Sequence, residues 1–480
     1  MIEYIGADAS ALDPALLSRE VGSFAIDSRE VHEGDLFFAL SQPEYQNNGF
    51  NGDFDDSTRF IPAALDQGAL AVVVRKDKLK EHGLEHLGER AILTQDVIKA
   101  LQRVAHGAYV EWNKPVVAIT GSAGKTTAKE LTSHVLAASG RKVLRNIKNY
   151  NNGLGHPLTV LRLAGDSSYE VAVLEMGMST PMNEIRRLCE ITPPDLAVVL
   201  NVLPVHVEHL GSIENVAKAK AEIVEGLKPN GTAVLNADDP RVAAMQGLAA
   251  KTLTYGIEKD ANVTAKNVRS DQLGSTNFEL VWNGQVSAVQ YPLDGKHNVS
   301  NSLAAAAVGI YFGMSLDDIA HALSSVKAPD QRGVVIEFDK GFTVIDDSYN
   351  SNPAALLSMV NTVANQAGGR KIVVAGEMLE LGVDEVEMHR RAGLEIARAG
   401  VDKLVGVRGL GKELVAGAIE GGLADSQFVE DSNEAGELVC SLVSKGDVVL
   451  VKGSRGVRTE KVVERLREKF TVRGRVSGED

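Results

Sequence analysis

The sequence predicts an α/β protein of three domains: a small mixed α/β N-terminal domain, a central parallel-sheet domain with a P-loop, and a C-terminal Rossmann-like α/β domain. Three observations support this. The 480 residues suffice for about three domains of roughly 150 residues each. Short apolar runs alternate with helix-like segments, a pattern typical of parallel sheets covered by helices. One of these runs leads directly into a glycine-rich loop.

The composition is that of a folded protein with an acidic surface. Hydrophobic residues make up 44% and charged residues 24% of the chain, which excludes a largely disordered protein. The formal net charge is −14, and the sequence shows no basic patch that would favour nucleic acid as a partner. An anionic ligand must therefore be held by backbone N–H groups, a few cations or a metal.

Cysteine usage and hydropathy indicate the compartment. Cys189 and Cys440 lie far apart, so the pattern favours neither a disulfide scaffold nor a cysteine-rich zinc site. The first ten residues, MIEYIGADAS, lack the basic and apolar regions of a secretory signal. The most apolar stretch, Ala304–Met314, is too short to span a bilayer. We expect a cytoplasmic protein without membrane insertion and, since no coiled-coil pattern is visible, a monomer.

The first domain is expected over residues 1–112. Its apolar runs Leu36–Leu40 and Ala69–Val74 predict strands. The polar stretch from Ser41 to Thr58 is rich in glycine and asparagine and predicts a long loop. Long loops in compact domains are often functional, so this one is a candidate for substrate contact.

The central and third domains are expected over residues 113–328 and 329–480. In the central domain, helices are predicted over Thr126–Ala138 and Ile213–Leu227, between strands at Pro115–Thr120, Glu170–Glu175, Leu196–Val202 and Thr232–Asn236. The third domain repeats this style, with strands expected at Thr343–Ile345, Lys371–Ala375, Lys403–Val407 and Asp447–Val451.

The strongest local motif is the loop from Thr120 to Thr127. Its two glycines allow a tight turn, and N–H groups at the start of the following helix can bind phosphate. Lys125 would reach the β- and γ-phosphates of a nucleotide, and the Thr126 hydroxyl would bind Mg²⁺. Ile119 departs from the usual pattern, which has glycine five positions before Gly124. The alternative is an ordinary glycine turn. The nucleotide-binding residues expected here are Gly121, Ser122, Ala123, Gly124, Lys125, Thr126 and Thr127.

Two residues at strand ends are candidate metal ligands. Glu175 ends a predicted strand, and His206 follows the next one. Ligands of open α/β sheets bind at the carboxyl ends of the strands. Mg²⁺ prefers oxygen ligands, so the imidazole is the less expected of the two. Taken singly, Glu175 could instead cap a helix and His206 could be an ordinary loop histidine.

Two lysines lie on the predicted helix that contains Ala217–Ile223. Lys218 and Lys220 are two positions apart, so they cannot face the same side of a helix. A solvated basic face is the ordinary interpretation of such a pair, and composition alone indicates no more.

Taken together, these residues resemble the Mur ligase family, the ATP-dependent amino-acid and peptide ligases of peptidoglycan precursor synthesis. The P-loop, Glu175, His206, Lys220 and the segment Lys296–Asn301 fall in the family's order. The resemblance is narrowest to members that join D-alanyl-D-alanine to UDP-N-acetylmuramoyl-tripeptide, and the Asp-Asn-Pro-Arg motif of the members that add the diamino acid is absent. Four stretches carry this narrower likeness: Asn149–Pro157, His209–Ser212 leading into Ala217–Ile223, Asp346–Pro353, and Gly376–Gly382 with His389.

The resemblance implies a reaction and its participants. ATP would phosphorylate the peptide carboxylate, and the amine of D-alanyl-D-alanine would then displace phosphate from the acyl phosphate. The expected cofactors are ATP and Mg²⁺, and the central domain would be an ATPase domain. The third residue of the peptide, meso-diaminopimelate or lysine, stays open. The third domain is expected to swing onto the central one and so protect the acyl phosphate from water.

The resemblance also implies roles for individual residues. Lys125 would contact phosphates, and Thr126, Glu175 and His206 would surround Mg²⁺. Lys220 matches a carbamylated lysine that could hold a second Mg²⁺. The remaining expected contacts are Asn298 and Asn301 with adenine, Arg332 and Asp347 with the γ-phosphate and ribose, and Ser28, Arg29, Asn151, Asn152, Asn350 and Asn352 with the UDP-sugar peptide or acceptor.

Some features depart from the family or leave alternatives open. The stretch from Ser41 to Thr58 is longer than usual, and Glu377 stands where aspartate is commoner. His389 could be structural, and His297 could orient the loop at Asn298. Two other functions keep the P-loop: a folylpolyglutamate synthase-like ligase, which would bind folate, and a nucleotide switch protein, which would hydrolyse ATP without an amino-acid product.

Overall fold

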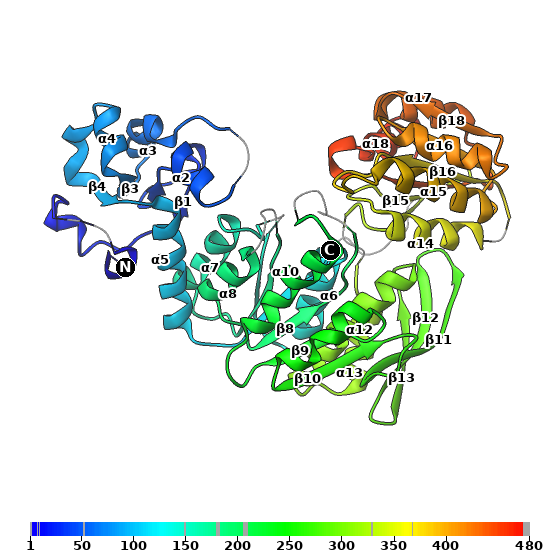
Figure 1. Cartoon of the computed structure of the whole chain (residues 1–480), viewed down its shortest axis with the longest axis horizontal. Coiled ribbons are helices and arrows are strands. Elements are labelled where there is room, and N and C mark those ends of the chain that lie inside the picture. The colour runs from blue at the N-terminus through cyan, green and yellow to red at the C-terminus, as the bar shows by residue number, and fades with distance from the viewer. Residues whose placement is uncertain are drawn as a thin grey trace.

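The structure is a computed structural model that describes residues 2–6, 8, 10–50, 53–147, 150–178, 183–204, 210–327, 330–366 and 368–473. Its α/β architecture, built around three separate sheets, confirms the predicted fold class. The N-terminal and C-terminal sheets lie at opposite ends of the central one, so the molecule has the outline of a U (Figure 1).

The N-terminal domain is built on a small parallel sheet in the order β1-β2-β3-β4. Its buried valines and phenylalanines pack between short helices and α5 (Val97–Trp112), the long helix that leads into the central domain. The other elements are β1 (Phe24–Ala25), β2 (Leu36–Phe38), β3 (Ala71–Arg75), β4 (Ala91–Thr94), α1 (Ile2–Ile5), α2 (Gln42–Asn47), α3 (Ile61–Asp66) and α4 (Lys76–Glu81).

The prediction of one long loop from Ser41 to Thr58 is wrong. Helix α2 begins after Ser41, and the side chain of Glu44 accepts a hydrogen bond from the Ser41 backbone N–H at 2.7 Å. This is a capping box, whose sequence signature is a serine followed three residues later by glutamate. A 3-10 helix then begins at Ser57. The asparagine-rich composition concealed these helices.

The central domain is built on a nine-stranded sheet in the order β13-β12-β11-β10-β9-β8-β5-β7-β6. Its first six strands are parallel. Four of them lie at the predicted apolar runs: β5 (Val116–Thr120), β7 (Val171–Glu175), β8 (Leu196–Val199) and β9 (Thr232–Asn236). The other two, β6 (Val143–Arg145) and β10 (Lys251–Gly256), were not predicted. Its helices are α6 (Lys125–Ala138), α7 (Gly155–Gly165), α8 (Glu184–Ile191), α10 (Ile213–Glu225), α11 (Pro240–Ala243), α12 (Lys296–Tyr311) and α13 (Leu316–Ser324).

The last three strands at one edge of this sheet form two antiparallel hairpins, so the sheet is not all parallel as expected. Strand β11 (Val263–Gln272) pairs antiparallel with β12 (Ser275–Trp282), which pairs antiparallel with β13 (Gln285–Tyr291). The second turn is Asn283-Gly284, with φ angles of 48° and 76°. Asn-Gly flanked by alternating apolar residues is a strong hairpin signal, which the prediction missed. The resulting hairpins extend the sheet toward the third domain (Figure 1).

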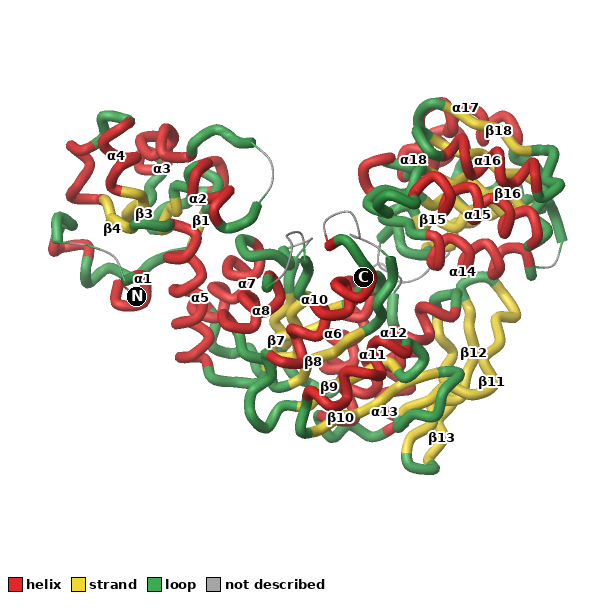
Figure 2. The backbone as a smooth tube through the Cα atoms, viewed as in Figure 1, coloured by secondary structure: helices red, strands yellow, loops and turns green. Residues whose placement is uncertain are grey.

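The third domain has a six-stranded sheet in the order β14-β15-β19-β16-β17-β18, parallel except for β14. Helices cover both faces, and loops gather at the end that faces the central domain (Figure 2). The elements are β14 (Val334–Glu337), β15 (Thr343–Asp347), β16 (Lys371–Gly376), β17 (Lys403–Val407), β18 (Ser426–Val429), β19 (Val448–Lys452), α14 (Pro353–Ala364), α15 (Glu385–Arg398), α16 (Gly411–Glu420), α17 (Ser432–Leu442) and α18 (Glu460–Lys469).

Other features bear on the expectations from composition. Cys189 and Cys440 are buried free thiols in different domains. Ala304–Met314 lies largely in α12, whose alanines are buried in the central core. Within the described ranges, every helix is too short or too polar to cross a membrane.

Candidate nucleotide-binding site

The loop between β5 and α6 has the geometry of a phosphate cradle. Asn201, just beyond β8, holds this loop by two hydrogen bonds. Its side-chain oxygen accepts from the Ala123 N–H at 2.9 Å, and its backbone oxygen accepts from the Ser122 N–H at 3.0 Å. Helix α6 then begins at Lys125, so the first N–H groups and the positive end of the helix dipole face the loop.

Gly124 must be glycine for two reasons. Its φ is 82°, a left-handed conformation that L side chains rarely adopt, and a Cβ there would lie 2.7 Å from the Asn301 side-chain oxygen. Asn301 on α12 is itself buried. The loop and the start of α12 therefore approach each other closely, and this places Asn301 beside the phosphate loop.

Lys125 lies folded back on the loop, where its Nζ donates to the Gly121 carbonyl oxygen at 2.8 Å. Desolvation lowers the pKa of its amine, and the positive charge of Arg332 lowers it further, while Glu175 acts in the opposite direction. A cation in this position is ready to exchange a neutral carbonyl for a charged phosphate oxygen, which is the stronger partner.

Glu175 at the end of β7 joins Thr126 of the phosphate loop. One carboxylate oxygen accepts from the Thr126 hydroxyl at 2.9 Å, and the other accepts from the Asn151 side-chain amide at 2.7 Å. The carboxylate is therefore engaged by these two side chains, and its position at a strand end faces the cavity rather than a helix start. A hydroxyl and a carboxylate this close form the oxygen-donor pair that Mg²⁺ prefers.

A buried asparagine fixes the backbone of Glu175. The Asn146 side-chain oxygen accepts from the Glu175 N–H at 2.6 Å, and its amide donates to the Glu175 carbonyl at 3.4 Å. Lys129, 1% exposed on α6, donates in turn to the Asn146 carbonyl at 2.7 Å. The backbone of Glu175 is therefore held by a chain of buried polar contacts that begins in the same helix as Lys125.

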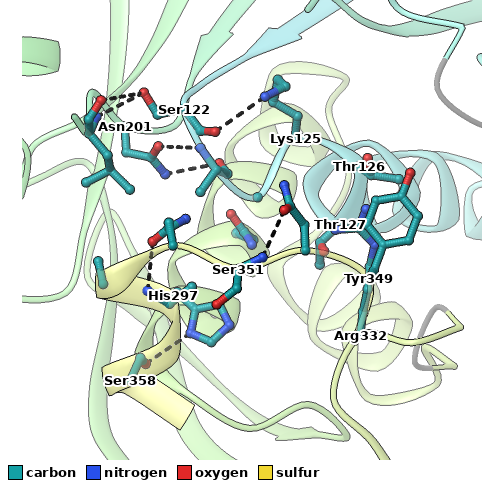
Figure 3. A pocket seen from close by; sticks show the side chains of 18 of the residues that line it. Ser122, Lys125, Thr126, Thr127, Asn201, His297, Arg332, Tyr349, Ser351 and Ser358 are labelled. Atoms are coloured by element: carbon teal, nitrogen blue, oxygen red, sulfur yellow. Dashed lines mark hydrogen bonds between the residues drawn. The ribbon is translucent and has the colours of Figure 1, made fainter. Parts of the chain in front are cut away.

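A cavity of about 670 Å³ lies between the phosphate loop and the third domain. Figure 3 shows Arg332 and Tyr349 of the third domain beside Thr126 and Thr127 of the central domain. Asp347, at the end of β15, forms an ion pair of 2.6 Å with Lys452, at the end of β19. The predicted site residues in the cavity wall are Ser122, Ala123, Gly124, Lys125, Thr126, Thr127, Asn151, Glu175, Asn298, Asn301, Arg332, Asp347, Asn350 and Asn352.

The start of α12 forms the floor of this cavity. Asn298 donates from its side chain to the Asp294 carbonyl at 2.7 Å, which orients it within the helix turn. The ring of His297 shares a hydrogen bond of 3.0 Å with Ser358 of α14, in the third domain. Burial lowers the pKa of His297 to about 4, so the ring is neutral at physiological pH. His297 thus links the two domains beside Asn298.

Lys218 and Lys220 differ as helix geometry requires. Lys218 is exposed, whereas Lys220 is 1% exposed. Burial lowers the pKa of the Lys220 amine well below its usual value, and the charge of Lys125 lowers it further; Glu184, Glu222 and Glu175 act in the opposite direction. A solvated basic face therefore describes Lys218 but not Lys220.

Other predicted residues lie apart from this cavity. Ser28 and Arg29 are in a 3-10 helix of the N-terminal domain, where Arg29 pairs with Asp27 at 2.6 Å. The side chain of Asn152 accepts from the N–H groups of Leu154 and Gly155 at the start of α7, so it organises that turn. His206, together with His209 and Asn149 of the family motifs, lies outside the described residues.

His389 and Glu377 organise loops of the third domain. The buried His389 ring accepts from the Met378 N–H at 2.8 Å and donates to the Glu385 carbonyl at 2.6 Å. Glu377 accepts from the Leu410 N–H at 3.0 Å. Neither residue lines the cavity, so the structural alternative for His389 agrees with its contacts.

Several residues of the site were missed by reasoning from the sequence. Asn201, Asn146, Lys452 and Tyr349 are single polar or aromatic residues outside the P-loop motif. The signal that could have found three of them is position, because Lys452 ends a buried strand and Asn201 and Tyr349 follow one, where ligands of parallel sheets bind. Nothing in the local sequence of Asn146 marks it.

Comparison with family models covers two of the three domains. Residues 119–309 match the Mur ligase middle domain. Residues 331–455 match the model described as Mur ligase, glutamate ligase domain. The two matches contain the phosphate loop and the cavity wall of the third domain, respectively.

Individual relatives match nearly the whole chain. The UDP-N-acetylmuramoyl-tripeptide–D-alanyl-D-alanine ligase of Bacillus subtilis is 34% identical over 447 residues, which are 92% of this chain and 93% of that protein. A crystal structure of MurF from Acinetobacter baumannii superposes with a TM-score of 0.82 at 26% identity, covering 94% of each chain. MurF ligase from Thermotoga maritima, solved in complex with ADP, gives 0.80 at 29% identity, covering 95% of this chain and 98% of that one.

Proposed function

The chain belongs to the Mur ligase family, and we propose that it uses ATP to join D-alanyl-D-alanine to the peptide carboxylate of UDP-N-acetylmuramoyl-tripeptide. The reaction is the one named for the Bacillus subtilis relative. The observation that carries the proposal is the cavity in which Lys125, Thr126 and Glu175 of the central domain face Arg332 and Asp347 of the third. This arrangement provides a nucleotide site with a second domain beside the expected position of the γ-phosphate.

The residues at the loop fit Mg²⁺. The Thr126 hydroxyl and the Glu175 carboxylate are 2.9 Å apart, and Asn151 holds the second carboxylate oxygen, so the donors are the hard oxygens that this ion binds. Thr126 and Glu175 would hold the ion, with His206 as a further expected ligand. Bound Mg²⁺ would neutralise phosphate charge during phosphoryl transfer.

The protein's own groups must bring like charges together. A peptide carboxylate and a γ-phosphate about 4 Å apart repel by roughly 4 kcal/mol at an effective dielectric constant of 20. Lys125 and Arg332 supply positive charge on two sides of the cavity. The carboxylate oxygen attacks the γ-phosphorus, ADP leaves, and an acyl phosphate forms. The acceptor amine then attacks the acyl carbon, loses a proton, and expels inorganic phosphate.

The surroundings of Lys220 favour carbamylation of its side-chain amine. Its burial favours the neutral amine, which is the form that reacts with CO₂. The resulting carbamate is an oxygen ligand like a carboxylate, and we propose that it supports a second Mg²⁺. Carbamylation of the neutral amine releases a proton and leaves an anion, which attracts the positive charge of Lys125.

Phosphate release tests the proposed reaction. We expect release with ATP and UDP-N-acetylmuramoyl-tripeptide to depend on D-alanyl-D-alanine, with single amino acids or glutamate giving little product. Mass spectrometry should show the ligated pentapeptide. Folate-dependent glutamate addition would favour the folylpolyglutamate synthase-like alternative, and hydrolysis that ignores every acceptor would favour a nucleotide switch. Either result would overturn the proposal.

A further inference from the structure

The guanidinium of Arg332 is held by an aromatic ring. Its central carbon lies 4.1 Å from the ring centroid of Tyr349, and the same ring has Arg455 at 5.6 Å. Figure 3 shows Arg332 stacked along Tyr349, near Thr126 and Thr127 of the phosphate loop. Across the described residues, Arg332 has no side-chain hydrogen bond or ion pair. Its N–H donors therefore remain available for a ligand, while the ring fixes its plane.

The backbone brings Arg332 and Tyr349 together. Gln331 and Gly333, on either side of Arg332, have φ angles of 59° and 78°, so the chain turns sharply as it enters the third domain. The Tyr349 N–H donates to the Gln331 carbonyl at 3.2 Å. Arg455 donates to the Gln331 side chain, also at 3.2 Å. The turn is therefore fastened to the loop after β15, and the Arg332 side chain is directed over the ring.

The positive charges around the cavity indicate that Arg332 binds an anion. The Lys125 ammonium group and the Arg332 guanidinium group both line it. Two cations that face one space repel each other. An anion bound between them would attract both cations and so offset this repulsion. Arginine suits this task because its planar fork can bind two phosphate oxygens at once.

We propose that Tyr349 is a positioning residue whose ring face aims Arg332 at the γ-phosphate of ATP, and so sets the preference of the site for ATP over ADP. The inference rests on the proposed nucleotide site and extends it to a residue outside the phosphate loop. An arginine restrained by stacking loses less side-chain freedom when it binds an anion than one that moves freely. The effect depends on the ring and not on the hydroxyl, because a cation binds the π face.

The test is a double-mutant cycle on nucleotide affinity. Calorimetry with Mg²⁺ present would measure Kd for ADP and for a non-hydrolysable ATP analogue in the wild type, Tyr349→Leu, Tyr349→Phe, Arg332→Gln and the Arg332→Gln/Tyr349→Leu double variant. We expect Tyr349→Leu to lower the ATP-over-ADP preference about fivefold, the size of one cation–π contact, with ADP affinity nearly constant. Tyr349→Phe should retain the preference, and Tyr349→Leu should add nothing once Arg332 is changed.

Three results would overturn the inference. Equal effects of Tyr349→Phe and Tyr349→Leu would assign the role to the hydroxyl. Equal losses of affinity for ADP and for the ATP analogue would show that the ring contributes to the pocket without distinguishing the two nucleotides. Additive effects in the double variant would show that Tyr349 acts independently of Arg332. Tyr311, which is 43% exposed at the end of α12, offers a matched ring deletion, Tyr311→Leu, and thermal melts would verify folding. Because the readout is nucleotide binding, failure of the ligase reaction would be seen separately, as absence of acceptor-dependent phosphate release.

Discussion

At the scale of single residues, Asn146 shows how the site depends on a side chain that touches no substrate. It holds Glu175 through both backbone groups and is itself 1% exposed. We expect Asn146→Ala to lower stability by about 1–3 kcal/mol, because buried backbone groups lose their partners. The Mg²⁺ concentration for half-maximal activity should also rise, since the Glu175 carboxylate loses its fixed position.

Urea denaturation and a Mg²⁺ titration of initial rates would measure these two effects. Asn365→Ala is a suitable control, because the exposed Asn365 side chain donates to the Asn361 carbonyl at a helix end. That control should stay within about 0.5 kcal/mol of the wild type. A Mg²⁺ requirement that is unchanged in Asn146→Ala would show that Glu175 holds its position without Asn146.

Whether a site residue could be predicted from the sequence depends on whether it acts locally or across a long stretch of chain. The phosphate loop is visible because glycines, lysine and threonine act through local backbone geometry, so their spacing is itself the signal. Asn201 and Lys452 contact residues far away in sequence, Ala123 and Asp347 respectively. These contacts form only when β8 lies beside β5 and β19 lies beside β15. Asn152, inside a family motif, also organises the turn at the start of α7, a role that the motif alone does not indicate.

At the scale of elements, Glu44 couples helix α2 to the start of α5. Its carboxylate accepts from the Ser41 and Val97 N–H groups at 2.7 and 2.8 Å, yet it is 1% exposed. Burial raises the pKa from 4.5 to about 7, and this outweighs the two hydrogen bonds, which act to lower it. The folded state thus binds a proton more tightly than the unfolded state does.

Stability should therefore fall as pH rises from about 4.5 to 7, by up to roughly 3 kcal/mol for this group. Urea denaturation across this range should show a decrease in the wild type that is smaller in Glu44→Gln, whose side chain stays neutral. Replacing the exposed Glu20 by Gln should leave the pH dependence as it is in the wild type. A Glu44→Gln curve parallel to that of the wild type would contradict the raised pKa.

Helix α10 offers a matched pair for the carbamate. Lys218→Ala should leave the ligase rate within about twofold, because that side chain is exposed, whereas Lys220→Ala should lower it about 100-fold, the upper range for groups that support a bound metal. A short carboxylic acid such as acetate should restore part of the lost rate. With ¹³C-bicarbonate, a carbamate NMR signal should appear in the wild type and in Lys218→Ala but be absent from Lys220→Ala. The same signal in Lys220→Ala would place the carbamate elsewhere.

Elements were predictable where burial alone determines them. The runs at Thr232–Asn236 and Lys403–Val407 are continuous apolar strands, and the structure has the same bounds. The β11–β13 hairpins and α2 were missed because their signals are turn and capping residues, Asn283-Gly284 and Ser41 with Glu44, rather than apolar periodicity. In these places local backbone chemistry outweighs average composition.

At the scale of the whole molecule, the N-terminal domain is far from the cavity. The N-terminal domain, which contains Ser28 and Arg29, lies at one end of the U, and the third domain, which contains Arg332, lies at the other (Figure 1). A substrate held at both places must span the space between the outer domains, so we expect the U to narrow when substrate and nucleotide bind.

Small-angle X-ray scattering would measure this closure. With a non-hydrolysable ATP analogue and UDP-N-acetylmuramoyl-tripeptide, the radius of gyration should fall toward the roughly 23 Å of a compact globule of this length. The nucleotide analogue alone should give a smaller decrease, because it bridges only the central and third domains. An unchanged radius under both conditions would contradict closure.

The hairpin between β11 and β12 constrains how such a motion can run. Its tip reaches the third domain, where Leu273 packs against the core and Gly274 lies beside Val335. The chain itself passes from the central to the third domain at a second place, near Gln331. A rigid body pinned at two points keeps a single rotation, about the line through them. While both contacts hold, the third domain can turn only about that line, so Arg332, the chain neighbour of Gln331, scarcely travels when the domain moves.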